Sequence, residues 1–135
     1  MRWRAEKLNT KGLALEEKGW SREAELAYMR ATKTDPHWSV PWFNLGLLAR
    51  RQRRWPELLE WNRRATGINA DDEGAWWNMG IAATALGDWD EARRAWAGFG
   101  LEIPAGRGPI ELDMGLTPIK ALGYSSFPRA GIAQW

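Results

Sequence analysis

Residues 41–46 read PWFNLG, and residues 75–80 read AWWNMG. Both hexapeptides place two aromatic residues, an asparagine, an apolar residue and a glycine in the same order, and the second begins 34 residues after the first. Another glycine, Gly12, lies 34 residues before Gly46. A sequence period of this length that recurs three times is typical of proteins built from stacked helical repeats.

The period divides most of the chain into three copies. They cover residues 5–38, 39–72 and 73–106. The pattern of each copy predicts two helices separated by a short turn. The first helices are expected over about 5–18, 39–53 and 73–86, and the second helices over about 21–33, 56–67 and 89–98.

The breaks between these segments carry the residues expected at helix ends. Gly19 and Gly87 suit the left-handed position that closes a helix. In the segment GDWDEA, Asp88 and Glu91 have the spacing of a capping box, and Pro56 suits a first helical turn. Two further N-cap residues are expected, Ser39 and Asp72.

Small and large residues alternate inside each copy, which indicates close packing of the two helices. The glycine of each first helix is expected to let the second helix approach, with Ala24, Leu58 and Ala92 in the facing position. Three residues are expected to fill the space between copies: Ala31, Ala65 and Phe99. The bulk of the core is assigned to Trp42, Trp55, Trp76, Trp89 and Trp96, since each aromatic side chain buries a large apolar area.

This constellation resembles the tetratricopeptide repeat (TPR) family. The third copy carries the family pattern as Trp76, Met79-Gly80, Ala92, Trp96 and Pro104. The first copy carries Gly12, Ala24, Tyr28, Ala31 and Pro36, whereas the second is weaker, with Leu58, Asn62 and Ala70. The resemblance implies an all-α, right-handed solenoid of three helix pairs, whose first helices line a concave groove that holds a partner peptide.

The same resemblance selects the groove residues. They are Asn9, Leu13, Phe43, Asn44, Leu47, Arg50, Arg51, Trp77, Asn78 and Ile81. An asparagine amide offers donors and an acceptor, so Asn44 and Asn78 could hold a peptide backbone while Phe43 and Trp77 supply exposed apolar contacts. The alternative is that the asparagines bond neighbouring helices and that the C-terminal tail covers the aromatic residues.

One specialised form of the groove does not fit the sequence. TPR domains that bind chaperones grip a C-terminal carboxylate with lysine, arginine and asparagine side chains. The matching positions here are Asn9, Leu13, Asn44, Gly74 and Asn78, of which only Asn44 agrees. We therefore expect no binding of Hsp70 or Hsp90 tails.

Composition and the lack of catalytic motifs favour a non-catalytic cytoplasmic protein, and the TPR resemblance implies a protein partner. The net charge is +2, there are no cysteines, and no apolar run could span a bilayer. We expect no metal or cofactor, because the one histidine, His37, falls in a turn. We expect no nucleic-acid or membrane partner, because the basic run RRQRR at residues 50–54 suits a helix end.

The final segment, residues 107–135, is rich in glycine and proline yet keeps many apolar residues. Its stretch GPIELDMGLTPIK is similar to the segment that follows the repeats in some bacterial TPR proteins. We expect it to cap the third copy as an irregular strap or short strands, although it could enter the groove instead. The alternative function is a structural module that forms homo-oligomers through the solenoid ends or this tail.

Overall fold

The computed structural model describes residues 2–101 of the 135-residue chain, and these residues form six helices. They are α1 (Arg2–Glu17), α2 (Ser21–Thr34), α3 (Val40–Arg51), α4 (Trp55–Ile68), α5 (Glu73–Leu86) and α6 (Trp89–Phe99). Pro104 and the expected capping tail lie outside the described residues.

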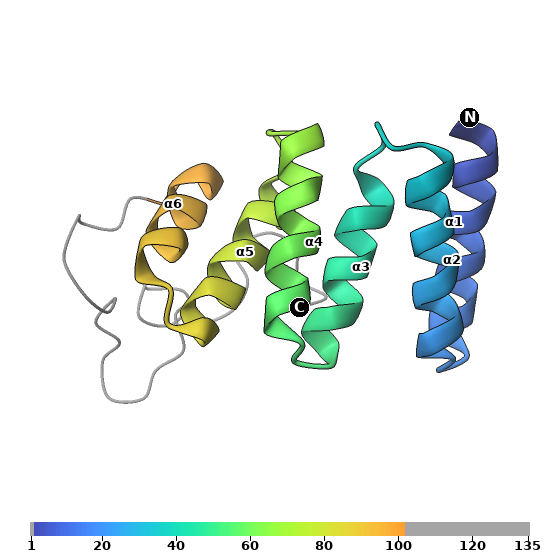
Figure 1. The fold of residues 1–135 in the computed structure, drawn as a ribbon, viewed down its shortest axis with the longest axis horizontal. Helices are drawn as coiled ribbons and strands as arrows, with labels where there is room; N and C mark the ends of the chain where they lie inside the picture. The colour runs from blue at the N-terminus through green and yellow to red at the C-terminus, as the bar shows by residue number, and fades with distance from the viewer. Residues whose placement is uncertain (1, 102–135) are drawn as a thin grey trace.

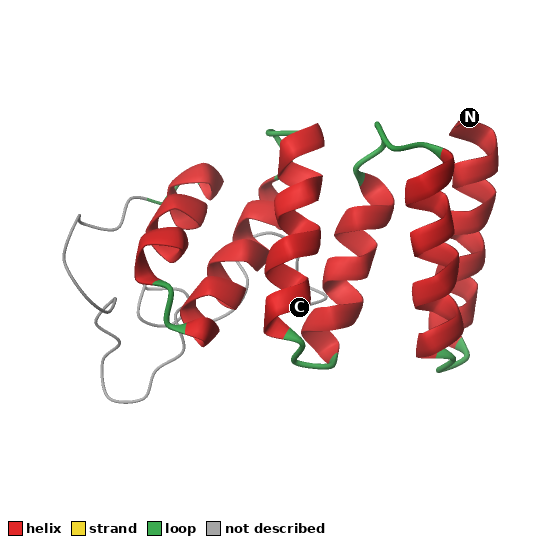
Figure 2. Ribbon diagram, viewed as in Figure 1, coloured by secondary structure: helices red, strands yellow, loops and turns green. Residues whose placement is uncertain are grey.

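The helices stack as three antiparallel pairs along the long axis of the molecule, from α1 and α2 at one end to α6 at the other (Figure 1). Figure 2 shows that the described part of the chain contains helices and loops and no strand. This arrangement confirms the all-α solenoid. The six helices fall where the period predicts them, except that α1 begins at Arg2, three residues early.

Most helix ends follow the expected chemistry. Gly19 and Gly87 have left-handed φ angles of 79° and 74°, which L-residues with side chains rarely adopt. The Asp72 and Asp88 carboxylates cap α5 and α6, accepting bonds of 3.1 Å and 3.2 Å from backbone N–H groups in the first turn. Each accepted bond satisfies a donor that the helix itself leaves unpaired.

Two expected caps are not formed. Ser39 precedes α3 but has helical angles, φ −78° and ψ −23°, and its side chain accepts no capping bond. Glu91 does not return a bond to Asp88, because its carboxylate pairs with Arg63 at 3.1 Å and with Arg94. The capping box is therefore half made, and Glu91 instead joins α6 to α4.

The glycines of the first helices lie against large side chains of the second helices. A Cβ atom added at Gly80 would lie 2.6 Å from the Trp96 ring, and one at Gly12 would overlap the Tyr28 ring. The close approach is confirmed, but the expected facing residues, Ala24, Leu58 and Ala92, are wrong. The facing position belongs to the residue one helical turn later, which is Tyr28, Asn62 or Trp96.

The assignment of the tryptophans to the core needs a correction. Trp96 is fully buried, whereas the other four expected core tryptophans are half-buried. Trp76 packs against core residues of repeats 2 and 3 while its Nε1 donates a 2.8 Å bond to the Ala70 carbonyl. A tryptophan at the edge of the core keeps one side of its ring toward solvent, so it buries apolar area without being completely buried.

Candidate functional site

The candidate site lies on α1, α3 and α5, the first helices of the three repeats. We call the surface they share the first-helix face. Leu13, Leu47 and Ile81 are 34 residues apart and so occupy the same place on each of these helices. Leu13 is 45% exposed, and Leu47 and Ile81 are half-buried. The repeat therefore carries one apolar residue in the same register across all three helices.

An amide pair joins α1 to α3 beside this apolar row. Asn44 Nδ2 donates a 2.9 Å hydrogen bond to Asn9 Oδ1. Asn9 is buried and Asn44 half-buried. Within the part of the chain that the structure describes, the Asn44 Oδ1 acceptor and the Asn9 Nδ2 donor form no hydrogen bond. The pair consequently keeps the Asn44 carbonyl oxygen as an acceptor and the Asn9 amino group as a donor for another group.

An ion pair links the C-terminal ends of α1 and α3. Arg51 pairs with Glu16, whose other carboxylate oxygen accepts a 2.5 Å bond from the Tyr28 hydroxyl. Burial, followed by this bond to Glu16, raises the pKa of Tyr28 well above its usual range. Arg50 is half-buried, and loss of hydration, aided by the neighbouring Arg51 charge, lowers its pKa to about 10. Both arginines belong to the expected site, and Arg51 already has an acidic partner.

Trp77 does not occupy the position expected of it. The side chain is fully buried, with its ring centroid 4.9 Å from that of Trp96 and 4.6 Å from that of Phe99. The expectation of an exposed Trp77 beside Phe43 is therefore wrong. Phe43 itself is half-buried on α3. Trp77 packs edge-on against Trp96, an arrangement that aromatic pairs favour.

Asn78 also lies inside the molecule. It is fully buried, and its Nδ2 donates a 3.0 Å bond to Asn62 Oδ1 on α4. Asn62 Nδ2 donates in turn to the Trp42 carbonyl at 3.3 Å. Asn78 therefore takes the alternative role considered for the asparagines, since it joins neighbouring helices and is not accessible to a ligand in this structure.

Asn62 is the residue that sequence reasoning missed. It stands at the position of Tyr28 and Trp96 in the other repeats, opposite Gly46. A polar side chain at a buried aromatic position needs hydrogen-bond partners. The asparagine at an aromatic position therefore indicated a buried polar contact, and Asn78 on α5 is the partner that the structure shows.

The described residues show no metal site and no catalytic group around the one histidine. His37 lies exposed in the turn between α2 and α3, where its backbone N–H donates a 3.1 Å bond to Asp35. Over residues 2–101, no three histidine or acidic side chains gather in a way that could hold a metal ion. None of the six described helices is both long and apolar enough to cross a bilayer.

Comparison with solved structures identifies the class of fold. The chain is similar to the first TPR of Spaghetti (RPAP3) bound to HSP90 peptide SRMEEVD, with a TM-score of 0.68 and 22% identity over 73% of this chain and 79% of that one. It is also similar to the second TPR of Spaghetti (RPAP3) bound to the same peptide, with a TM-score of 0.68 and 19% identity over 76% of this chain and 94% of that one.

The fold is that of a TPR domain, as the repeat pattern predicted. Neither the scan against protein-family models nor the comparison with curated proteins gives a match. The resemblance of the segment after the repeats to bacterial TPR proteins falls outside the described residues and stays a prediction.

Proposed function

We propose that this chain is a non-catalytic interaction module that binds an extended peptide segment on the first-helix face. The observation that carries the proposal is the Asn9–Asn44 pair, which offers the Asn44 carbonyl oxygen and the Asn9 amino group next to an apolar row. A peptide backbone presents a C=O and an N–H at each residue, so it matches such a pair without regard to side-chain sequence.

The apolar row gives the site its preference among peptides. Leu13 and Leu47 flank the amide pair one turn along α1 and α3, and Phe43 precedes Asn44. Covering their accessible area with an apolar side chain of the partner would contribute about 25 cal/mol per Å². We therefore propose a segment with one or two large apolar side chains and a backbone held by Asn9 and Asn44.

The two similar structures support a peptide as the class of partner, because each binds one. They give no support to the expectation that an Hsp90 tail will not bind, which continues to rest on this chain alone. Asn78 is buried and bonded to Asn62, and Gly74 is buried. Since neither position supplies a cation, we propose that an uncharged segment binds in preference to the acidic SRMEEVD peptide.

A displayed library of random decapeptides tests the proposal. Selection on the wild-type chain is expected to enrich peptides with large apolar residues, and binding of a synthetic enriched peptide is then measured by calorimetry. Asn44→Ala should weaken binding about tenfold, because the peptide loses one hydrogen bond and the Asn9 amide loses its orienting partner.

Lys33→Ala is the matched control, since Lys33 is exposed on the second helix α2, and it should leave the affinity unchanged. The SRMEEVD peptide is titrated alongside and is expected to bind at least tenfold more weakly than the enriched peptide. Equal binding of the enriched peptide by wild type and Asn44→Ala would place the site elsewhere. Tighter binding of SRMEEVD would overturn the preference for an uncharged segment.

A further inference from the structure

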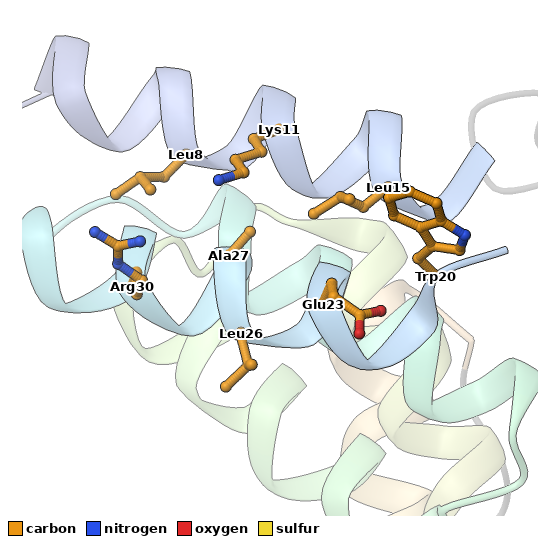
Figure 3. A pocket seen from close by; sticks show the side chains of 8 residues that line it. All are labelled: Leu8, Lys11, Leu15, Trp20, Glu23, Leu26, Ala27 and Arg30. Atoms are coloured by element: carbon orange, nitrogen blue, oxygen red, sulfur yellow. The ribbon is translucent and has the colours of Figure 1, made fainter. Parts of the chain in front are cut away.

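A furrow runs between α1 and α2 at the end of the solenoid, and Figure 3 shows the side chains that line it. None of them is among the residues of the first-helix face. It has a volume of about 460 Å³ and is lined by Leu8, Lys11, Leu15, Trp20, Glu23, Leu26, Ala27 and Arg30. We call it the end furrow. Two of its apolar side chains are among the most exposed in the described chain, with Leu26 60% and Trp20 53% accessible.

The repeat register shows what kind of surface this is. The residues 34 positions after Leu8 and Lys11 are Trp42 and Leu45. Leu45 forms one apolar cluster with Ala24 and Tyr28 of the preceding repeat, and Trp42 packs against this cluster. One period later, Trp76 and Met79 pack in the same way against residues of α4. The end furrow is therefore the face by which a TPR receives another helical unit.

The furrow has two chemically different ends. Figure 3 shows Leu8 and Arg30 toward one end and Leu15, Trp20 and Glu23 toward the other. Leu8 and Leu15 are seven residues apart on α1, and Glu23 and Arg30 are seven residues apart on α2. Both spacings correspond to about 10 Å along a helix. No ion pair links Glu23 or Arg30 to another described residue.

We propose that the end furrow binds the end furrow of a second copy of this chain, about a two-fold axis that lies in the face and crosses both helices. This symmetry reverses the second copy, so Leu8 meets Leu15 of the other chain and Glu23 meets Arg30 of the other chain. Each contact occurs twice, as the self-complementary interface of a two-fold dimer requires.

The middle of the furrow is compatible with this approach. Ala27 is small and buried, and Leu26 beside it on α2 is 60% exposed, so the contact of the two α2 helices at the axis is apolar. Lys11 lies near the axis on α1, where its long stem can cover apolar surface while its ammonium group extends to solvent. Two ion pairs and two leucine pairs therefore flank an axis near which Leu26 and Lys11 of each chain also lie.

Sedimentation velocity on the full chain tests the proposal over about 5 to 300 µM, the range in which a micromolar dimer dissociates. The wild type is expected to dimerise. Glu23→Arg and Arg30→Glu should each weaken the dimer at least tenfold, because each variant places like charges opposite one another. An equimolar mixture of the two variants should recover the dimer, since every arginine then faces a glutamate.

Arg53→Glu is the control, because it reverses an exposed charge in the loop between α3 and α4. It should leave the dimer intact, as should Asn44→Ala, so the result is independent of peptide binding. Recovery in the mixture also shows that both variants are folded. A wild type that stays monomeric over the whole range, a dimer that neither single variant weakens, or a mixture that stays monomeric would each overturn the proposal.

Discussion

Asn78 and Asn62 are hydrogen-bonded to each other in the interior, with Asn78 Nδ2 3.0 Å from Asn62 Oδ1. Asn62 also donates to the Trp42 carbonyl, so the two amides connect α3, α4 and α5. The Asn78 Oδ1 atom is buried and has no hydrogen-bond partner. Repeats 2 and 3 are therefore joined by a buried hydrogen bond between two amides, within a core whose other side chains are mostly apolar.

Removing one member of this pair should be costly. Asn78→Ala leaves Asn62 Oδ1 buried without a donor, and we expect the free energy of unfolding to fall by about 1 to 3 kcal/mol. The measurement is urea unfolding followed by far-UV circular dichroism. In the double variant Asn62→Leu/Asn78→Leu both polar groups are gone, so its loss should be smaller than the sum of the two single leucine variants. Strictly additive losses would contradict the coupling.

The glycine contacts predict opposite effects for one chemical change. Gly80→Ala places a methyl group against the rigid Trp96 ring, and we expect a loss of about 1 to 3 kcal/mol despite the better helix propensity of alanine. Gly67→Ala, near the end of α4, meets nothing within 4 Å and should stabilise by up to about 1 kcal/mol. Thermal unfolding should show a lower midpoint for Gly80→Ala than for the wild type and a higher one for Gly67→Ala. A stabilised Gly80→Ala chain would show that the helices of repeat 3 can separate without cost.

Tyr28 makes stability depend on alkaline pH. Burial and the bond to Glu16 raise its pKa in the folded chain, whereas an unfolded tyrosine ionises near pH 10. Above about pH 10 the unfolded chain therefore binds fewer protons than the folded chain, and the stability contributed by Tyr28 falls by up to about 1.4 kcal/mol per pH unit. Below pH 10 that contribution is fully present.

Comparison with Tyr28→Phe isolates this effect. The difference in unfolding free energy between the wild type and the variant should be constant from pH 7 to about 9 and then shrink as the pH rises further. The lowered pKa of Arg50 acts in the opposite direction but is common to both chains, so it cancels in the difference. Parallel pH profiles would show that Tyr28 ionises as easily in the folded chain as in the unfolded one.

The two kinds of N-cap should respond differently to truncation. Asp88→Ala removes an acceptor for the Glu91 N–H and should cost about 1 kcal/mol. Ser39→Ala removes no capping bond, and we expect a change within about 0.5 kcal/mol. Chemical denaturation of the two variants provides the test. A large loss for Ser39→Ala would mean that its hydroxyl group caps α3 in solution.

The period carried most of the information about the fold. The 34-residue spacing, the glycines and the N-caps at Asp72 and Asp88 locate the helices without any tertiary knowledge. Which of two adjacent tryptophans is buried could not be read in the same way. Trp76 and Trp77 differ by about 100° around the helix, and both are large and apolar, so the choice depends on what packs against α5.

The candidate site was predicted less completely than the fold. Asn44 and Asn78 share a register position, yet one bonds Asn9 near the surface and the other bonds Asn62 in the interior. The difference arises from the residues across from them, because repeat 2 has asparagine where its neighbours have Tyr28 and Trp96. A side chain of the preceding helix, Asn62 on α4, thus decides the role of Asn78, although Asn44 and Asn78 occupy the same position in their repeats.

The asparagine in the middle repeat also bears on how the array opens. In a linear array each unit is stabilised by its own packing and by its immediate neighbours, so cooperativity between the two ends must pass through the centre. Asn62 supplies less apolar contact there than Tyr28 or Trp96 supply in their own repeats. The central unit, and not the two ends alone, therefore sets the free energy of sub-global opening. Amide protons of α4 should exchange earlier than expected for a helix between two others.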